Sequence, residues 1–264
     1  MSGDLVNQLK SRGAVFAALV AMILAPSANA VSGNNVTEEF HKTVPLNANG
    51  RLSLENINGN VEITGWERNE VQIDAEKSAR DQQRLNEATI EVENTGDSVR
   101  IRTRYPEGHT NNNPASVQYT LHVPAGAQLD KISLINGSLN VSQISGEVNA
   151  SLVNGKLTAH DLAGRAKLST VNGSNDVMFR SLANVSEVKI SSVNGSISLV
   201  LPASPNADIS ASTVNGSLTT DFPIQVQGKF VGHRMSGTLG SGGTRIELSN
   251  VNGSTHIGPG GASL

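Results

Sequence analysis

Polar and apolar residues alternate along this chain in a fixed relation to the dipeptide Asn-Gly, which occurs eight times. In most copies the positions three and five residues after the Asn are apolar, and the positions two and four residues after it are polar. After Asn136, for example, Leu139 and Val141 alternate with Ser138 and Asn140. This alternation predicts β-strands that turn one face inward and the other outward.

The copies recur at short and similar intervals. From Asn136 onward the intervals are 18, 18, 22, 21 and 37 residues, and the longest divides into 21 and 16 if Met235–Leu239 is counted as a degenerate copy. A period of about 20 residues is typical of a solenoid. Seven of the Asn directly follow an Ile or Val, and six consecutive copies carry a Ser three residues before the Asn, namely Ser133, Ser151, Ser169, Ser191, Ser212 and Ser249.

Each repeat is expected to contain two strands and two corners. The Asn-Gly pair forms one corner, and a second turn falls at Ser145-Gly146 and Ala163-Gly164. Gly provides a positive φ at such corners, while Asn tolerates one and bonds nearby backbone. We expect the Asn amides of stacked repeats to hydrogen-bond along the stack. The predicted corner residues are Asn58, Gly59, Asn136, Gly137, Asn154, Gly155, Asn172, Gly173, Asn194, Gly195, Asn215, Gly216, Asn252 and Gly253.

Two arrangements of these strands are open. Asn-Gly is also the strongest short signal for a β-hairpin, so an antiparallel meander is the alternative. A meander gives no reason for Ser, Val and Asn to recur in register, whereas a parallel stack places equivalent residues about 4.8 Å apart. Parallel crossovers are nearly always right-handed. We therefore predict an all-β fold, a right-handed parallel β-solenoid with rungs of about 18–22 residues.

The interval of 78 residues from Asn58 to Asn136 contains no further Asn-Gly and differs from the repeats. Residues 75–88 are compatible with a helix or a loop, and Thr89–Glu93 with Ser98–Arg104 predict a hairpin. Its outer face would pair Glu91 and Glu93 with arginines across the strands. An anion site made by Arg100, Arg102 and Arg104 is the alternative. We expect this region to be a β-rich cap that shields one end of the stack.

The first thirty residues predict export. Lys10 and Arg12 precede an apolar run from Ala14 to Ala25, and small residues follow up to Ala30. This order is typical of a signal peptide cleaved near Ala30, and the apolar run is shorter than the about 20 residues that cross a bilayer. We expect a protein of the periplasm, the cell surface or the medium, without a transmembrane segment in the mature chain.

The predicted organisation has five parts. Residues 1–30 form the signal peptide and residues 31–40 a linker. Residues 41–130 form the N-terminal β-rich cap with the first repeat. The repeats of the solenoid occupy residues 131–258, and residues 259–264 form a flexible tail.

Composition excludes several classes of function. The 264 residues include 20 Lys and Arg, 23 Asp and Glu, and no Cys, which excludes disulfide scaffolds, thiol catalysis and Cys-ligated metals. A formal net charge of −3 provides no basic field for nucleic acid. The six His lack the spacing of metal ligands, and no nucleophile-elbow or phosphate-loop motif occurs. We expect no enzyme activity, no metal and no cofactor.

The function that remains is binding. We expect an exported, non-catalytic interaction protein of the envelope or surface, whose partner is a glycan or an envelope protein. The alternatives are a periplasmic accessory partner of a membrane regulator and a polysaccharide-active β-helix enzyme. The candidate interaction face is the flat polar face of the repeats, which carries Ser138, Asn140, Lys156, Thr158, Ser174, Asp176, Ser196, Ser198, Ser217 and Thr219.

Several short motifs also resemble a known family. They are Ile57–Val61 around the early Asn-Gly, Gly65–Val71, Tyr119–Gly126 and the later Val-Asn-Gly repeats. In this order, over roughly residues 40–258, the chain resembles the bacterial putative-adhesin family, a β-strand-repeat domain of unknown function. The resemblance implies an exported or envelope-attached β-solenoid without established catalytic residues. The family has no accepted site, so it assigns no functional residue here.

Overall fold

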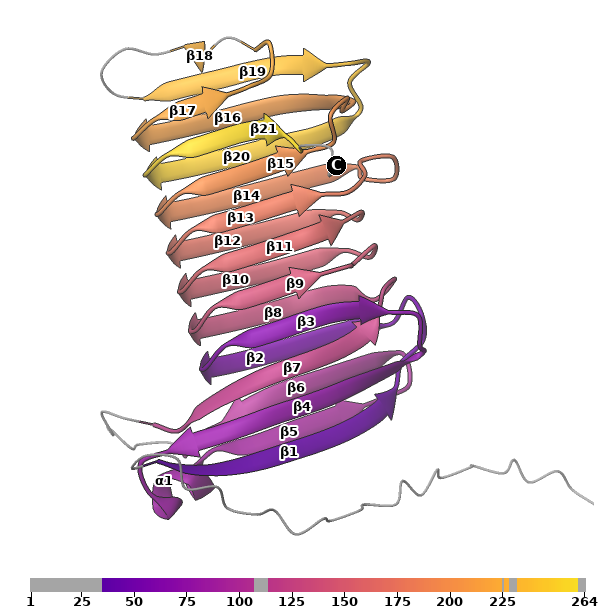
Figure 1. Ribbon diagram of the computed structural model, residues 1–264, viewed down its shortest axis with the longest axis vertical. Coiled ribbons are helices and arrows are strands. Elements are labelled where there is room, and N and C mark those ends of the chain that lie inside the picture. Colours follow the sequence, from indigo (N-terminus) through magenta and orange to yellow (C-terminus); the bar gives the residue numbers. More distant parts are fainter. Residues whose placement is uncertain (1–34, 107–113, 225, 228–231, 261–264) are drawn as a thin grey trace, which may run out of the picture.

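The computed structural model describes residues 35–106, 114–224, 226–227 and 232–260, which form an all-β protein with one short helix, α1 (Gln82–Glu87). Figure 1 shows the strands stacked one above another along the long axis. The predicted signal peptide lies outside the described residues, as does most of the predicted tail.

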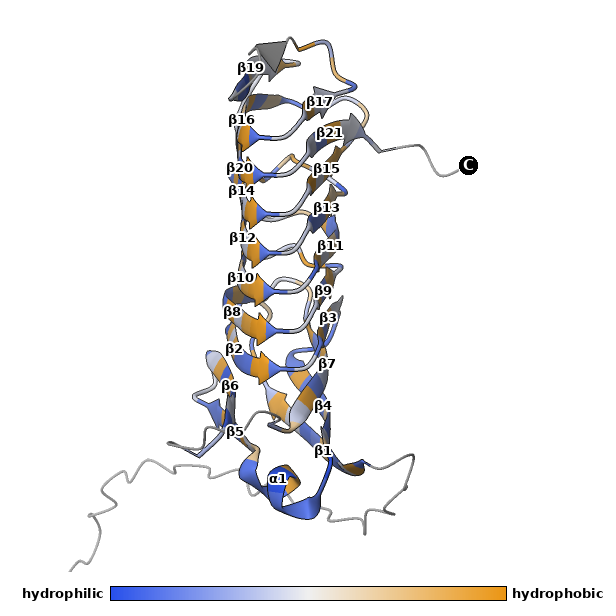
Figure 2. Ribbon diagram, turned by 90° about the vertical axis from the view of Figure 1, so that its left-hand side faces the viewer, coloured by the Kyte–Doolittle hydropathy of each residue, from blue (hydrophilic) through white to orange (hydrophobic). Residues whose placement is uncertain are grey.

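The strands form two sheets that face each other across the core (Figure 2). The ten-stranded sheet contains, in spatial order, β1 (Val36–Pro45), β4 (Glu70–Ala79), β7 (Ser116–Pro124), β3 (Val61–Trp66), β9 (Leu139–Ser142), β11 (Leu157–Leu162), β13 (Asn175–Phe179), β15 (Ile197–Leu201), β21 (Thr255–Pro259) and β17 (Leu218–Thr220).

The eleven-stranded sheet lies opposite. It contains, in spatial order, β18 (Val226–Gln227), β19 (His233–Leu239), β16 (Ala207–Asn215), β20 (Thr244–Asn252), β14 (Glu187–Asn194), β12 (Ala166–Asn172), β10 (Val148–Asn154), β8 (Gln128–Asn136), β2 (Arg51–Asn58), β6 (Ser98–Arg104) and β5 (Thr89–Asn94).

Each repeat contributes one strand to each sheet, and the Asn-Gly corner joins the two. Neighbouring repeats are parallel and in register, since Ser151 pairs with Ser133 on one side and with Ser169 on the other. The parallel pairing predicted from the columns is therefore confirmed, and the antiparallel meander is wrong for the repeats. The right-handed sense of the coil stays a prediction.

The Asn side chains form a continuous amide ladder along the stack. Nδ2 of Asn154 donates to Oδ1 of Asn136 at 2.9 Å, and Nδ2 of Asn172 donates to Oδ1 of Asn154 at 3.0 Å. The expected bonding between Asn amides is confirmed. In spatial order the ladder runs through Asn58, Asn136, Asn154, Asn172, Asn194, Asn252 and Asn215.

The spatial order of the repeats differs from their order in the sequence at the C-terminal end. The last repeat, β20 with β21, lies between β14/β15 and β16/β17, as the yellow strands between orange ones show in Figure 1. The proposed degenerate copy at Met235–Leu239 is wrong, because this segment belongs to β19 and runs antiparallel to β16. A strand that returns antiparallel cannot form a further rung of the parallel stack.

The first repeat is likewise enclosed at the other end. β2 pairs with β8 on one side and with β6 on the other, while β3 lies between β9 and β7. The 78-residue interval is thus an excursion that returns to cover the first repeat. β1 begins at Val36, so part of the segment expected as a linker is a strand paired with β4.

The excursion contains antiparallel strands and α1. Only Gln82–Glu87 of the helix-compatible segment is helical, and Asp81 caps it by accepting a hydrogen bond from the Arg84 backbone N–H at 2.8 Å. Residues 75–79 belong to β4, because their alternation buries every second side chain against the core.

β5 and β6 form the predicted hairpin, and its charged side chains pair. Arg104 contacts Glu91 at 3.1 Å, and Arg100 contacts Glu93 at 3.8 Å. Arg102 instead reaches Glu55 of β2 at 3.8 Å. Each of the three arginines therefore has a carboxylate beside it, which supports ion pairing over an anion site.

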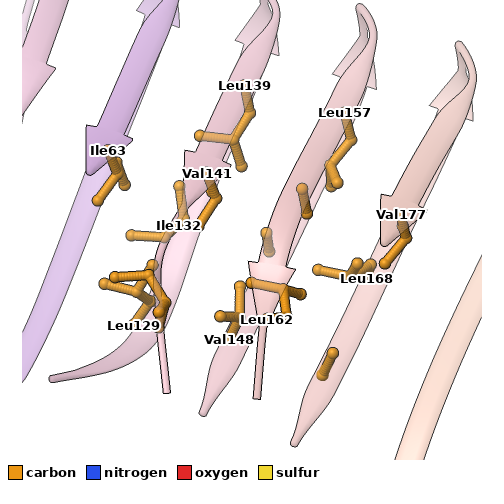
Figure 3. Close-up of a cluster of buried hydrophobic side chains, with 14 of the residues drawn as sticks. Ile63, Leu129, Ile132, Leu139, Val141, Val148, Leu157, Leu162, Leu168 and Val177 are labelled. Atoms are coloured by element: carbon orange, nitrogen blue, oxygen red, sulfur yellow. The ribbon is translucent and has the colours of Figure 1, made fainter. Parts of the chain in front are cut away.

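The core lies between the two sheets and follows the predicted alternation. Leu139, Leu157 and Val177 are at most 1% exposed, and Figure 3 shows them in one buried cluster with Leu129 and Leu168. The columns three and five residues after the Asn thus point inward, even where the residue is polar. Two such polar residues, Asn175 and Thr255, are fully buried, and Nδ2 of Asn175 donates to Oγ1 of Thr170 at 2.8 Å.

The apolar residues directly before the Asn point outward, although apolar-in alternation would place them inside. They lie on the same side of the strand as the Ser two residues earlier, so the pleat directs both to the outer face. They form a column along the eleven-stranded sheet, visible as orange bands near the strand ends in Figure 2. Ile57, Ile135, Val153, Val171, Val193, Val251 and Val214 make up this apolar ridge, and each is 37–48% exposed.

Candidate interaction face

The ten predicted interaction residues lie on the outer face of the ten-stranded sheet, which we call the polar face. They stand two and four residues after five of the seven corner Asn, where the pleat directs them away from the core. All ten are exposed or half-buried. The repeat therefore brings together residues that are far apart in the sequence.

The residues four after each Asn form one straight row across the sheet. Asn140 pairs with Thr158, which pairs with Asp176. Ser198 and Thr219, adjacent in repeat order, are separated by His256 of the inserted β21. Nδ1 of His256 lies 3.1 Å from Oγ1 of Thr219. His256 stands four residues after Asn252, so the offset rule identifies it although the predicted set did not include it.

The row continues beyond the repeats onto the excursion. Asn140 pairs with Glu62 of β3, and Glu62 pairs with Thr120 of β7. Thr120 pairs with Asp74 of β4, which pairs with His41 of β1. Glu62 has the same offset from Asn58 and was detectable by that rule. The other three residues follow no Asn-Gly, so no sequence signal marked them.

Two shallow hollows lie on this part of the polar face. One has a volume of about 420 Å³, and the other has about 260 Å³. Gln118 and Thr120 line both, so the hollows adjoin. The larger is lined by four of the ten predicted residues together with Glu62 and His160, and the smaller by Glu39, His41, Asp74 and Glu76.

The charges on the polar face are unevenly distributed. Nζ of Lys156 lies 3.3 Å from Oδ2 of Asp176 on the next rung, so these two side chains neutralise each other. Glu39 and Glu76 occupy directly opposite positions on β1 and β4, an arrangement of like charges that is unfavourable. The smaller hollow is therefore the more acidic part of the face.

His41 balances some of this negative charge. Its Nδ1 lies 2.8 Å from Oδ1 of Asp74, and its Nε2 lies 3.4 Å from Oε2 of Glu39. The hydrogen bond with Asp74, followed by that with Glu39, raises the pKa of His41 above its ordinary value of 6.5. The protonated ring is thus favoured in the folded protein.

We expect NMR titration of the His41 ring protons to give a pKa above 6.5, and Asp74→Asn to lower that pKa. Because the folded state favours protonation, the pair stabilises the fold fully below the unfolded pKa. This contribution is lost as the pH rises through the folded pKa. A His41 pKa that is the same in the wild type and in Asp74→Asn would contradict the assignment.

No three His, Asp or Glu side chains within the described residues are arranged to hold a metal ion. Of the six His, His109 lies outside the described residues, and the other five are on separate strands. The absence of metal, cofactor and catalysis stays a prediction. Nor does the described part of the chain contain a helix long and apolar enough to span a membrane.

Three crystal structures are similar to this chain. One, of a "putative cell adhesion protein" from Clostridium sporogenes, is 17% identical, with 85% of this chain and 100% of that chain covered and a TM-score of 0.48. A second, of a "putative adhesin" from Bacteroides fragilis, is 12% identical, with 84% and 97% covered and a TM-score of 0.41. The third, of a "putative lipid binding protein" from Parabacteroides distasonis, is 10% identical, with the same coverage and a TM-score of 0.30.

None of the curated proteins matches the chain. One protein-family model matches part of the repeats. Residues 157–258 match the family model Toastrack DUF4097, which spans the strands from β11 to β21. Over these residues the chain is similar to the Toastrack DUF4097 family, a match that confirms the family resemblance its repeats suggest.

Proposed function

We propose that this chain is an exported, non-catalytic interaction protein of the cell envelope or surface, a right-handed β-solenoid that binds an extended partner through its polar face. The observation that carries the proposal is the row of polar side chains across all strands of the ten-stranded sheet, from His41 to Thr219. The predicted signal peptide supports export.

The geometry of the row favours a long partner over a compact one. Strands in a sheet lie about 4.8 Å apart, so ten strands present polar groups along about 43 Å. The adjoining hollows give the row a shallow concave stretch over β1, β4, β7, β3, β9 and β11. A polysaccharide strand has hydroxyl groups at regular intervals and fits such a row.

The charges of the repeats support binding over catalysis. Asp176 is the one carboxylate among the ten predicted residues, and Lys156 holds it at 3.3 Å. Hydrolysis of a glycosidic bond uses a pair of carboxylates across the scissile bond, with one of them protonated. The ten predicted residues therefore lack that arrangement, and the other carboxylates of the row, Glu62 and Asp74, lie beyond them on β3 and β4.

A capture experiment with purified bacterial peptidoglycan, chitin and cellulose tests the proposal. We expect Lys156→Glu to reduce the captured fraction at least about tenfold, since it places a second carboxylate beside Asp176 and breaks the ion pair. Lys189→Glu is the matched control. Lys189 forms a similar pair with Glu247 at 3.2 Å, but on the eleven-stranded sheet.

The two variants distinguish binding through the polar face from binding through the eleven-stranded sheet. Their lysines are exposed to nearly the same degree, 52% and 51%, so loss of a surface charge acts equally in both. Equal capture of Lys156→Glu and Lys189→Glu by every polysaccharide would contradict binding through the polar face. So would failure of the wild type to be captured at all.

A further inference from the structure

The outer face of the eleven-stranded sheet carries an unusual set of side chains. Within the described ranges, every large hydrophobic side chain that is exposed belongs to the apolar ridge. The ridge is straight, because its members occupy equivalent register positions on neighbouring parallel strands. A continuous exposed apolar strip with polar neighbours is typical of a protein interaction surface.

A second column on the same face alternates in charge. It lies six residues before the ridge position and runs Glu147, Arg165, Glu187, Arg245 and Asp208 in spatial order. Arg165 contacts Glu147 at 3.6 Å, while Arg245 is in register with Glu187 on one side and Asp208 on the other. If a second copy of this column runs in the opposite direction and is shifted by one rung, each positive side chain lies opposite a negative one.

We propose that this face is the interface of a homodimer, in which two copies pack their apolar ridges together with the rung order inverted. A two-fold axis parallel to the strands, between the rungs of Asn172 and Asn194, generates the arrangement. Val171 then faces Val193 of the second copy, and Val153 faces its Val251. In the charged column, Arg165 faces Glu187 of the second copy.

The remaining polar neighbours are compatible with this pairing. Lys167 faces Lys189 of the second copy, but Lys189 is held by Glu247 of its own chain at 3.2 Å. The Ser column lies between the ridge and these charges and has small side chains that let the faces approach. Face-to-face sheets pack about 10 Å apart, within reach of paired Arg and Glu side chains.

The area is sufficient for a specific dimer. Six overlapping rungs at about 4.8 Å and four columns at about 6.8 Å cover about 29 Å by about 20 Å. Each copy then contributes roughly 600 Å², so the total of roughly 1,200 Å² reaches the range of specific interfaces. The dimer would also leave both polar faces outward, which gives the proposed partner two binding surfaces.

Light scattering during size-exclusion chromatography tests the dimer. We expect the wild type to have the mass of two chains, and Val171→Asp with Val193→Asp to weaken association at least about 100-fold, because buried carboxylates would oppose each other at the centre. Ser174→Asp with Ser196→Asp is the matched control, since these residues occupy the same rungs on the polar face. It should remain a dimer.

Crosslinking tests the orientation and does not depend on a destabilising change. The chain contains no Cys, so introduced thiols report only the intended contact. A mixture of Val171→Cys and Val193→Cys chains should form a disulfide between different chains under mild oxidation. A mixture of Val171→Cys and Ile57→Cys is the control, because Ile57 lies outside the overlap.

Three results would overturn the proposal. One is a monomer of the wild type at concentrations up to about 100 μM, far above the Kd of a specific interface of this size. Another is equal disulfide yield in the test and control mixtures. The third is a crosslink that joins identical positions of two Val171→Cys chains in preference to the mixed pair, since the proposed axis between the rungs of Asn172 and Asn194 places Val171 opposite Val193.

Discussion

Replacing Gly155 by Ala is expected to lower the free energy of unfolding by roughly 3 kcal/mol or more. Gly155 has a φ of +146°, and a Cβ there would lie 2.1 Å from the carbonyl oxygen of Gly137 on the preceding rung. Neither atom can move aside, because both corners are held in the hydrogen-bonded stack. Chemical denaturation in urea measures the effect.

Gly96→Ala is the control for this prediction. Gly96 also has a positive φ, +86°, but no heavy atom lies within 4 Å of a Cβ built there. In this variant the free energy of unfolding should fall by only about 1 kcal/mol, from the backbone strain of an Ala at a positive φ. If Gly155→Ala and Gly96→Ala are equally stable, the close approach of stacked corners is not what requires Gly.

Truncating Leu157 to Ala is expected to lower the free energy of unfolding by about 2 to 5 kcal/mol. The side chain is fully buried between the sheets, and its register neighbours are Leu139 and Asn175. Rigid backbone hydrogen bonds on both sides prevent the strands from closing the cavity. The measurement is the shift of the urea midpoint at unchanged slope.

Val153→Ala in the same rung is the matched control. Val153 is 40% exposed on the apolar ridge, so truncation leaves no enclosed cavity. We expect a loss below about 1 kcal/mol when the protein is dilute. A larger loss for Val153→Ala than for Leu157→Ala would contradict the assignment of inner and outer columns.

Most of the repeat architecture could be predicted from residue columns. Ser151 and Asn154 recur with the same spacing in successive rungs, and only a parallel stack gives a reason for that recurrence. The amide ladder and the buried positions after each Asn follow from the same spacing. The excursion between Asn58 and Asn136 has no such columns, so its hairpin was predicted from local alternation, but the course of β4 and its place beside β1 were not.

The candidate face was predicted only in part. Offsets from each Asn identified ten residues, and the same offsets would have found Glu62 and His256. Thr120, Asp74 and His41 extend the row without any repeat signal. They are placed there by long-range strand pairing, which no local pattern encodes.

The corners, the period, the parallel register and the inward columns follow from the residue pattern, because each depends on one rung and on the identity of equivalent positions. The order of the rungs, in contrast, follows only from the folded chain. Any two Asn-Gly repeats can pair in the same register. The stability of strand pairing therefore does not determine that Asn252 lies between Asn194 and Asn215. That choice depends on the path of the connecting segment through β18 and β19, and on pairing every strand edge that the path leaves open.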